Sequence, residues 1–181
     1  PFSGPLVATI EPGARAFPAG PPETPVVREL ALEIGTAADA EVLEVLPADP
    51  ETIDLSEADR IIAGGIGLGV DEHFRTLSRV GKLLRASVGA TRPAVDAGWT
   101  DFPRQIGTTG ALIPPALYIA VGISGAVQHT SGLGNPAHII SVNTDASCPM
   151  MQLADLAVVA DGPGTLAELE RLLGEEAAGE A

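Results

Sequence analysis

The sequence predicts an α/β domain in which helices cover both faces of a parallel sheet, preceded by a short β-containing arm. Several short apolar runs lack the polar alternation of half-exposed strands, which is typical of parallel strands buried on both faces. Segments with helical spacing of apolar residues separate these runs. The chain has 181 residues, of which 45% are hydrophobic, and this suffices for one packed domain with an arm.

The arm is expected to span residues 1–57, as the end of another domain. Residues 6–10 favour a short strand, and prolines and glycines then interrupt the pattern. Residues 26–27 and 40–46 favour further extended pieces. Because too few apolar positions remain for an independent core, we expect the main domain to span residues 58–181.

The first half of this domain predicts two strands with a helix between them. Residues 58–69 contain an apolar strand that runs into glycines, and Asp71 can cap the helix that follows. The apolar side chains of this helix recur at helical spacing: Phe74, Leu77, Val80 and Leu84. Residues 87–95 are expected to form the second strand, which contains a sharp turn.

The second half predicts three further strands, at residues 116–122, 138–143 and 156–161. A short helix is expected over residues 125–131. Thr165 is expected to open the last helix with Glu168 as its capping-box partner, and the acidic residues 174–181 to form a frayed tail.

Composition excludes several functional classes. The formal net charge of −14 disfavours binding to a phosphate backbone, and 3% aromatic residues offer little for base stacking, so we expect no nucleic-acid partner. Cys148 is the only cysteine, which excludes an internal disulfide, and with three histidines it forms no metal-ligand pattern.

The start of the chain lacks the charged and apolar regions of a signal peptide. The longest apolar segment, residues 111–121, contains two prolines and is too short to cross a membrane. We therefore expect a soluble protein of the bacterial cytoplasm, without membrane insertion.

Polar residues gather where the predicted strands end. These positions are Gly64 to Gly67, Thr91 and Arg92, Ser124 to His129, Asn143 to Asp145, and Asp161. In parallel sheets, ligands bind outside the carboxyl ends of the strands. The sequence therefore predicts one extended ligand, such as a dinucleotide, across this edge.

Three motifs leave alternatives open. GGIGLG (64–69) follows a strand, but Val70 stands where a dinucleotide fingerprint needs its last glycine, so a phosphate-binding turn and a plain tight turn both fit. GISGA is not a serine nucleophile elbow, because Ala126 replaces the final glycine; Ser124 with nearby N–H groups and a helix dipole suits an anion instead. Arg92 precedes Pro93, which favours an extended turn, and spacing alone fits both a ligand contact and a plain surface arginine.

Six motifs, in this order and spacing, resemble the alpha subunit of electron transfer flavoproteins. They are GGIGLG, VGATRPAVDAGW, QIGTTG, PALYIAVGISGAVQH, IISVNTD and LAVVAD, within residues 58–162. Residues 7–17 also resemble the end of that subunit's N-terminal domain. The chain is thus similar to the C-terminal portion of the subunit, with most of the N-terminal domain absent.

The resemblance implies a Rossmann-like domain that binds FAD and acts as an electron carrier without a substrate of its own. It also implies a heterodimer with a beta-type subunit. The expected redox partners are a dehydrogenase as donor and an acceptor such as a quinone reductase.

The resemblance further implies roles around the flavin. Arg92 would place a buried positive charge against the ring, Thr109 would reach N5, and His129 would lie near O2 as a donor or an imidazolium. Thr91 keeps a hydroxyl where the family commonly has serine, and Ser124 would face the pyrophosphate or ribityl chain. The implied cofactor site comprises Thr91, Arg92, Ile106, Gly107, Thr108, Thr109, Ser124, Gly125, Ala126, Val127, Gln128, His129, Asn143 and Asp161, the last two at the adenosine end.

Two departures from the family pattern suggest a divergent branch. Ile66 replaces an arginine in the first turn, which removes a charged contact to the nucleotide part of FAD, and Gly162 follows Asp161 where the family commonly has leucine. A related domain that binds NAD or AMP without flavin chemistry stays open, as does a structural module with a degenerate site. Arg92, Thr109 and His129 favour the flavin, because a nucleotide alone would leave them without a role.

Overall fold

The computed structural model describes residues 43–44 and 49–179, nearly all within the second of two compact units, Val45–Ala181. Three sequence predictions fall wholly or mostly outside the described residues: the strand at 6–10 and the extended pieces at 26–27 and 40–46. The boundary between arm and domain therefore stays a prediction.

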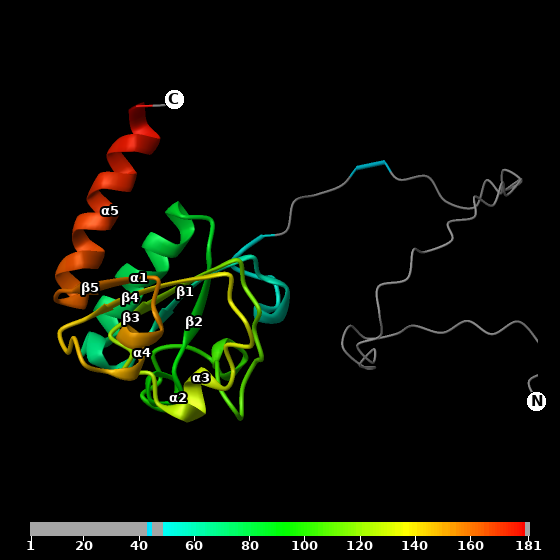
Figure 1. Cartoon of the computed structure of the whole chain (residues 1–181). Coiled ribbons are helices and arrows are strands. Elements are labelled where there is room, and N and C mark those ends of the chain that lie inside the picture. The colour runs from blue at the N-terminus through cyan, green and yellow to red at the C-terminus, as the bar shows by residue number, and fades with distance from the viewer. Residues whose placement is uncertain (1–42, 45–48, 180–181) are drawn as a thin grey trace, which may run out of the picture. The chain divides into compact units, whose positions relative to one another are not determined.

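Five strands form one fully parallel sheet in the order β2-β1-β3-β4-β5 (Figure 1). Their bounds are β1 Arg60–Gly64, β2 Ser87–Ala90, β3 Leu117–Val121, β4 His138–Asn143 and β5 Leu156–Val159. Each strand lies in an apolar run that predicted it, so the α/β parallel-sheet prediction is confirmed.

In the described part of the chain, five helices and three short 3-10 turns precede, connect or follow the strands. The helices are α1 Asp71–Leu83, α2 Arg92–Asp96, α3 Val127–Thr130, α4 Pro149–Leu153 and α5 Gly162–Gly179, and the 3-10 turns are η1 Leu55–Glu57, η2 Ile66–Leu68 and η3 Phe102–Arg104. Helix α1 matches its predicted apolar spacing. Asp71 is its first helical residue, whereas Val70 occupies the capping position without a side-chain bond.

The sheet has a hydrophobic core on each face, because neighbouring side chains of a strand point in opposite directions. In β1, Ile62 joins the core formed with α1 and α5, while Ile61 and Ala63 join the core on the other face. The second face is covered by α4, through Met150 and Met151, and by loops rather than long helices. Helices thus lie on both faces, with the two long ones packed together on one of them (Figure 1).

The strand order creates a crevice between β1 and β3. The chain passes from β1 to β2 on one side and then returns to the other side of β1 to form β3. At such a switch point, the loops after neighbouring strands diverge and leave room for a ligand at the carboxyl ends.

Three local predictions were wrong. Arg92 lies in the first turn of α2 rather than in an extended turn, because the first turn of a helix tolerates the following proline. Helix α5 begins at Gly162, since Asp161 rather than Thr165 caps it: Asp161 Oδ2 accepts from Gly164 N at 2.8 Å. The acidic residues up to Gly179 continue this helix instead of fraying.

Candidate functional site

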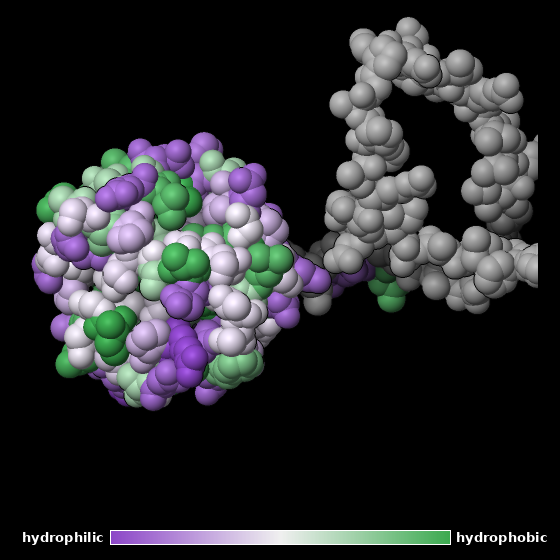
Figure 2. Space-filling model, turned by 60° about the horizontal axis from the view of Figure 1, so that its bottom comes forward, coloured by the Kyte–Doolittle hydropathy of each residue, from purple (hydrophilic) through white to green (hydrophobic). Residues whose placement is uncertain are grey.

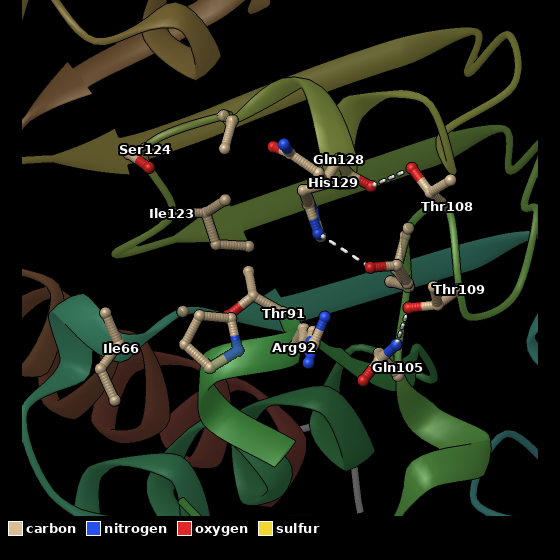
Figure 3. Close-up of a pocket in the computed structure, with 16 residues that line it drawn as sticks. Ile66, Thr91, Arg92, Gln105, Thr108, Thr109, Ile123, Ser124, Gln128 and His129 are labelled. Atoms are coloured by element: carbon tan, nitrogen blue, oxygen red, sulfur yellow. Dashed lines mark hydrogen bonds between the residues drawn. The ribbon is translucent and has the colours of Figure 1, made fainter. Parts of the chain in front are cut away.

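A cavity of about 390 Å³ opens at the carboxyl ends of β1, β2 and β3, within the size range of ligand pockets (Figure 3). Its walls come from Gly65, Ile66, Thr91, Arg92, Pro93, Gln105, Ile106, Gly107, Thr108, Thr109, Ile123, Ser124, Gly125, Ala126, Gln128 and His129. The loops after three different strands therefore meet at one place. The sequence predicted polar clusters after all five strands, and the clusters at 143–145 and 161 do not line this cavity.

The turn after β1 is a packing turn. Its glycines are required by close backbone approach, since a Cβ on Gly65 would lie 2.2 Å from Gly122 O. Gly65 N donates to Val121 O at 3.0 Å and Gly67 N to Gly122 O at 3.1 Å, so these donors are already used. The structure favours the tight-turn interpretation of GGIGLG, with Ile66 as an apolar wall of the cavity.

The loop after β3 offers unused backbone donors to the cavity. Gly122 and Gly125 have φ values of +65° and +83°, which only glycine adopts without strain. Within the described residues, the N–H groups of Ser124, Gly125 and Ala126 meet no acceptor. Helix α3 spans only four residues, so these N–H groups, rather than a helix dipole, are what this loop presents to an anionic or carbonyl oxygen.

Thr91 presents a buried hydroxyl that has no hydrogen-bond partner in the described part of the chain. Only 8% of the residue is exposed, and it lines the cavity at the end of β2 (Figure 3). Because burying an unpaired hydroxyl is unfavourable, a polar atom of a ligand would satisfy it. This orphaned group and the free N–H groups show that the cavity suits a ligand rich in oxygen and nitrogen atoms.

The loop of residues 105–110 positions two threonines. The buried Gln105 donates through Nε2 to Thr109 Oγ1 at 2.9 Å, which leaves the Thr109 proton free to be donated. Thr108 instead is held by Gln128: its N–H donates to Gln128 O at 2.8 Å and its hydroxyl to the same oxygen at 3.2 Å.

His129 lies at the cavity floor with both ring nitrogens engaged. Nδ1 lies 3.2 Å from Ile106 O, and Nε2 lies 2.7 Å from the Tyr118 hydroxyl. Burial lowers the pKa of His129 to about 4, against a smaller opposing effect of the bond to Ile106 O, so the ring is neutral at pH 7. The imidazolium alternative is therefore disfavoured, and neither nitrogen is free for a ligand.

Arg92 lines the cavity from α2, but its charge is not buried as expected. Its side chain is 69% exposed, and Nε lies 3.4 Å from Asp96 Oδ2. The positive charge is thus at the cavity lip, in contact with solvent.

Three predicted site residues do not line the cavity. Val127 is 76% exposed on α3. Asn143 Nδ2 donates to Ile123 O at 3.0 Å, which supports the loop after β3 from behind. Asp161 caps α5 and lines a separate open hollow with Thr165 and Glu168.

Several residues that form or support the site were absent from the implied list of cofactor-site residues, although the sequence placed Gly65 and Ile66 at this edge of the sheet. The additional lining residues are Gly65, Ile66, Pro93, Gln105 and Ile123. Gln105 opens the QIGTTG motif and was detectable there as a polar residue beside two hydroxyls. Tyr118 lies in an apolar run, and nothing local marks its contact with a residue eleven positions later.

No cluster of three or more metal-ligating side chains exists among residues 43–44 and 49–179. Over the same residues, no helix is both long and apolar enough to cross a membrane.

Comparison with known proteins identifies the domain. Residues 54–134 match the family model described as "Electron transfer flavoprotein FAD-binding domain". The chain is 42% identical over 165 residues to protein FixB of Bradyrhizobium diazoefficiens, covering 87% of this chain and 43% of that protein. It is 36% identical over 170 residues to the electron transfer flavoprotein subunit alpha of Clostridium acetobutylicum, covering 91% and 50% respectively.

The alpha subunit of Bacillus subtilis is 42% identical over 135 residues, covering 75% of this chain and 40% of that protein. The chain thus spans half or less of the length of these curated relatives. The match to the family model includes every residue that lines the cavity. The chain belongs to the electron transfer flavoprotein alpha-subunit family and corresponds to its FAD-binding portion.

Proposed function

We propose that the cavity holds the flavin end of FAD and that the chain acts as the cofactor-binding part of an electron carrier. FAD, when bound, accepts electrons and passes them on, while the chain binds and tunes it. The observation that carries this proposal is the buried, unpartnered Thr91 hydroxyl beside the free N–H groups of the loop after β3. The hydroxyl and the N–H groups favour a polar ligand, and the matched family model, an FAD-binding domain, indicates that this ligand is FAD.

The residues around the cavity contribute hydroxyl groups, backbone N–H groups and apolar walls to ligand binding. Thr109, aligned by Gln105, offers a hydroxyl proton to the ligand, and Thr91 offers a second hydroxyl. The N–H groups of Ser124, Gly125 and Ala126 suit the ribityl or phosphate oxygens. Ile106 and Ile123 are buried and provide apolar walls that keep water away from these donors.

Arg92 supplies a positive charge at the cavity lip. A cation there favours additional negative charge on a reduced ligand, and this raises its reduction potential. Because the side chain is mostly exposed, solvent screens the effect unless a partner covers it.

Asn143 and Asp161 are proposed at the adenosine end of the cofactor, outside the cavity itself. Their present hydrogen bonds are within the protein, so contacts with the adenosine would be added to them. Ile66 offers no charge to the nucleotide part, and this leaves more of the binding to backbone donors.

We further propose a heterodimer with a beta-type subunit, located in the cytoplasm, that exchanges electrons with a dehydrogenase and a downstream acceptor. The face that carries α2 and α3 shows separate hydrophobic patches among polar ones (Figure 2). Exposed Ile66 and Val127 contribute such apolar surface. A mixed surface of this kind occurs at subunit interfaces and elsewhere on proteins, so the proposed heterodimer depends on the family match.

The test is the visible absorption spectrum of the chain purified with its beta-type partner. We expect flavin bands at about one FAD per heterodimer. The variant Thr91→Val should weaken FAD binding about tenfold, because one hydrogen bond from a desolvated hydroxyl is lost. Ser141→Ala is the matched control, since Ser141 is the other buried hydroxyl without a partner and does not line the cavity.

A folded heterodimer that takes up no added FAD would contradict the proposal. A heterodimer that binds NAD or AMP in place of FAD would favour the nucleotide-binding alternative. Equal FAD affinity in Thr91→Val and the parent would remove Thr91 from the site.

A further inference from the structure

Tyr118 lies beneath the cavity without lining it. The residue is in β3, is 0% exposed, and packs within the core cluster that also contains Ile113 and Leu133. Among the described residues, its hydroxyl has one hydrogen-bond partner, His129 Nε2 at 2.7 Å. A buried hydroxyl that reaches out of an apolar cluster to a single imidazole indicates a specific polar link in the core.

The direction of each proton in this link follows from the partners. Ile106 O can only accept, so the hydrogen bond at 3.2 Å requires a proton on His129 Nδ1. The neutral ring then has a lone pair on Nε2, and Tyr118 must donate its hydroxyl proton to it. The ring is therefore held between one donor and one acceptor, in one tautomer.

The link joins two walls of the cavity. Ile106, whose N–H donates to Ala90 O at 2.9 Å, opens the loop that carries Thr108 and Thr109. His129 follows Gln128, the residue whose carbonyl accepts from Thr108. The imidazole thus connects the loop of residues 105–110 with α3, at the point where the two walls meet.

We propose that Tyr118 is a positioning residue, which holds His129 as a neutral Nδ1–H imidazole and through it fixes the loop of residues 105–110 against α3. This inference rests on the proposed function in one respect, namely that the cavity takes the flavin end of FAD. His129 then presents an uncharged ring to the flavin, and the hydrogen-bond donors left for the ligand are the hydroxyls of Thr91 and Thr109 and the backbone N–H groups.

The first test needs no cofactor. In the full chain labelled with ¹⁵N-histidine, NMR correlation through the ring carbons reports the protonation of each ring nitrogen. We expect His129 to carry its proton on Nδ1, and Tyr118→Phe to shift the Nε2 signal. His73, whose Nδ1 lies 2.6 Å from Leu68 O, is the internal control and should not change. A proton on Nε2 in the parent chain, or an unchanged His129 signal in the variant, would overturn the proposal.

The second test measures FAD affinity in the heterodimer. Tyr118→Phe should weaken binding about threefold to tenfold, as expected for one lost hydrogen bond that orders the site. In a His129→Ala background, the same change should have no further effect, because Tyr118 acts through His129. Ile113→Val, in the same core cluster, controls for a loosened core and should leave affinity unchanged.

An effect of Tyr118→Phe that persists in full in the His129→Ala background, or that Ile113→Val reproduces, would assign Tyr118 to the core alone and overturn the proposal. If the parent heterodimer binds no FAD, the proposed function fails, whereas the ring-nitrogen measurement still decides the role of Tyr118.

Discussion

Individual polar residues around the cavity differ in whether the fold already satisfies them. His129, Asn143 and Thr108 each have partners within the protein, while the Thr91 hydroxyl has none among the described residues. A buried polar group without a partner costs free energy, and at a cavity wall it is informative about a ligand. A motif residue that is already paired, such as Asn143, supports the structure of the site, and its proposed contact with the adenosine would be added to that bond.

The buried His129 makes the stability of the fold depend on pH. Its pKa is about 4 when folded against an ordinary 6.5, so between these values the unfolded chain binds a proton that the folded chain does not. Stability from this residue is complete above pH 6.5 and decreases as pH falls toward 4. From pH 7 to pH 5, the unfolding free energy should fall by about 2 kcal/mol more in the parent than in His129→Gln.

Urea unfolding of both proteins at several pH values measures this difference. Carboxylate protonation contributes equally to the two curves and cancels when they are subtracted. Parallel curves would show that His129 does not titrate in this window.

At the scale of elements, the sequence predicted what depends on neighbouring residues in the chain. Helix α1 was evident because Phe74, Leu77 and Val80 repeat at helical spacing, and all three are buried. Helix α2 was missed because the rule that residues before proline are extended does not hold in the first turn of a helix, where Arg92 lies. The start of α5 was missed because Asp161 and Thr165 compete as caps.

The sequence likewise predicted the parts of the site that depend on strand ends, and it did not predict those that depend on tertiary packing. Thr91 and the loop after β3 follow strands and were predicted from that pattern, because parallel strands bring their carboxyl ends together. Thr109 follows the 3-10 turn η3 and was expected only from the family resemblance. The pair of Tyr118 and His129 depends on how β3 and α3 pack in space, which no local pattern encodes. The exposure of Arg92 likewise depends on tertiary packing.

The contact between the turns after β1 and β3 sets the shape of the cavity, and Gly65 tests it. Gly65→Ala would force a Cβ to within 2.2 Å of Gly122 O, so the two turns must separate. We expect a loss of about 2 kcal/mol in the unfolding free energy, as is usual for overpacked positions. Gly174→Ala is the matched control: it lies in α5 with open space around it and should stabilise the fold by about 0.5–1 kcal/mol.

Thermal or urea unfolding of the two variants provides the measurement. If Gly65→Ala were as stable as the parent, the turns would have room to separate and the packing-turn interpretation would be wrong.

At the scale of the molecule, the described residues 50–55, which the sequence assigns to the arm, pack against the sheet domain. Leu55 is 1% exposed and lies in the same core cluster as Tyr118. Arg104 donates to the carbonyl oxygens of Ile53 and Glu51, and Ser87 Oγ donates to Pro50 O at 2.8 Å. These contacts tie residues 50–55 to the loop that leads into the cavity.

A comparison of two shortened chains tests where the domain begins. A chain of residues 49–181 retains these contacts and should fold, whereas 58–181 loses the buried Leu55 and the hydrogen bonds of Arg104 and Ser87. Burial of one leucine alone contributes about 1.5–3 kcal/mol, so we expect 58–181 to melt roughly 10 °C below 49–181. Leu55→Ala within 49–181 should reproduce part of this decrease. Equal melting temperatures of the two chains would place the start of the domain at residue 58, as the sequence alone predicts.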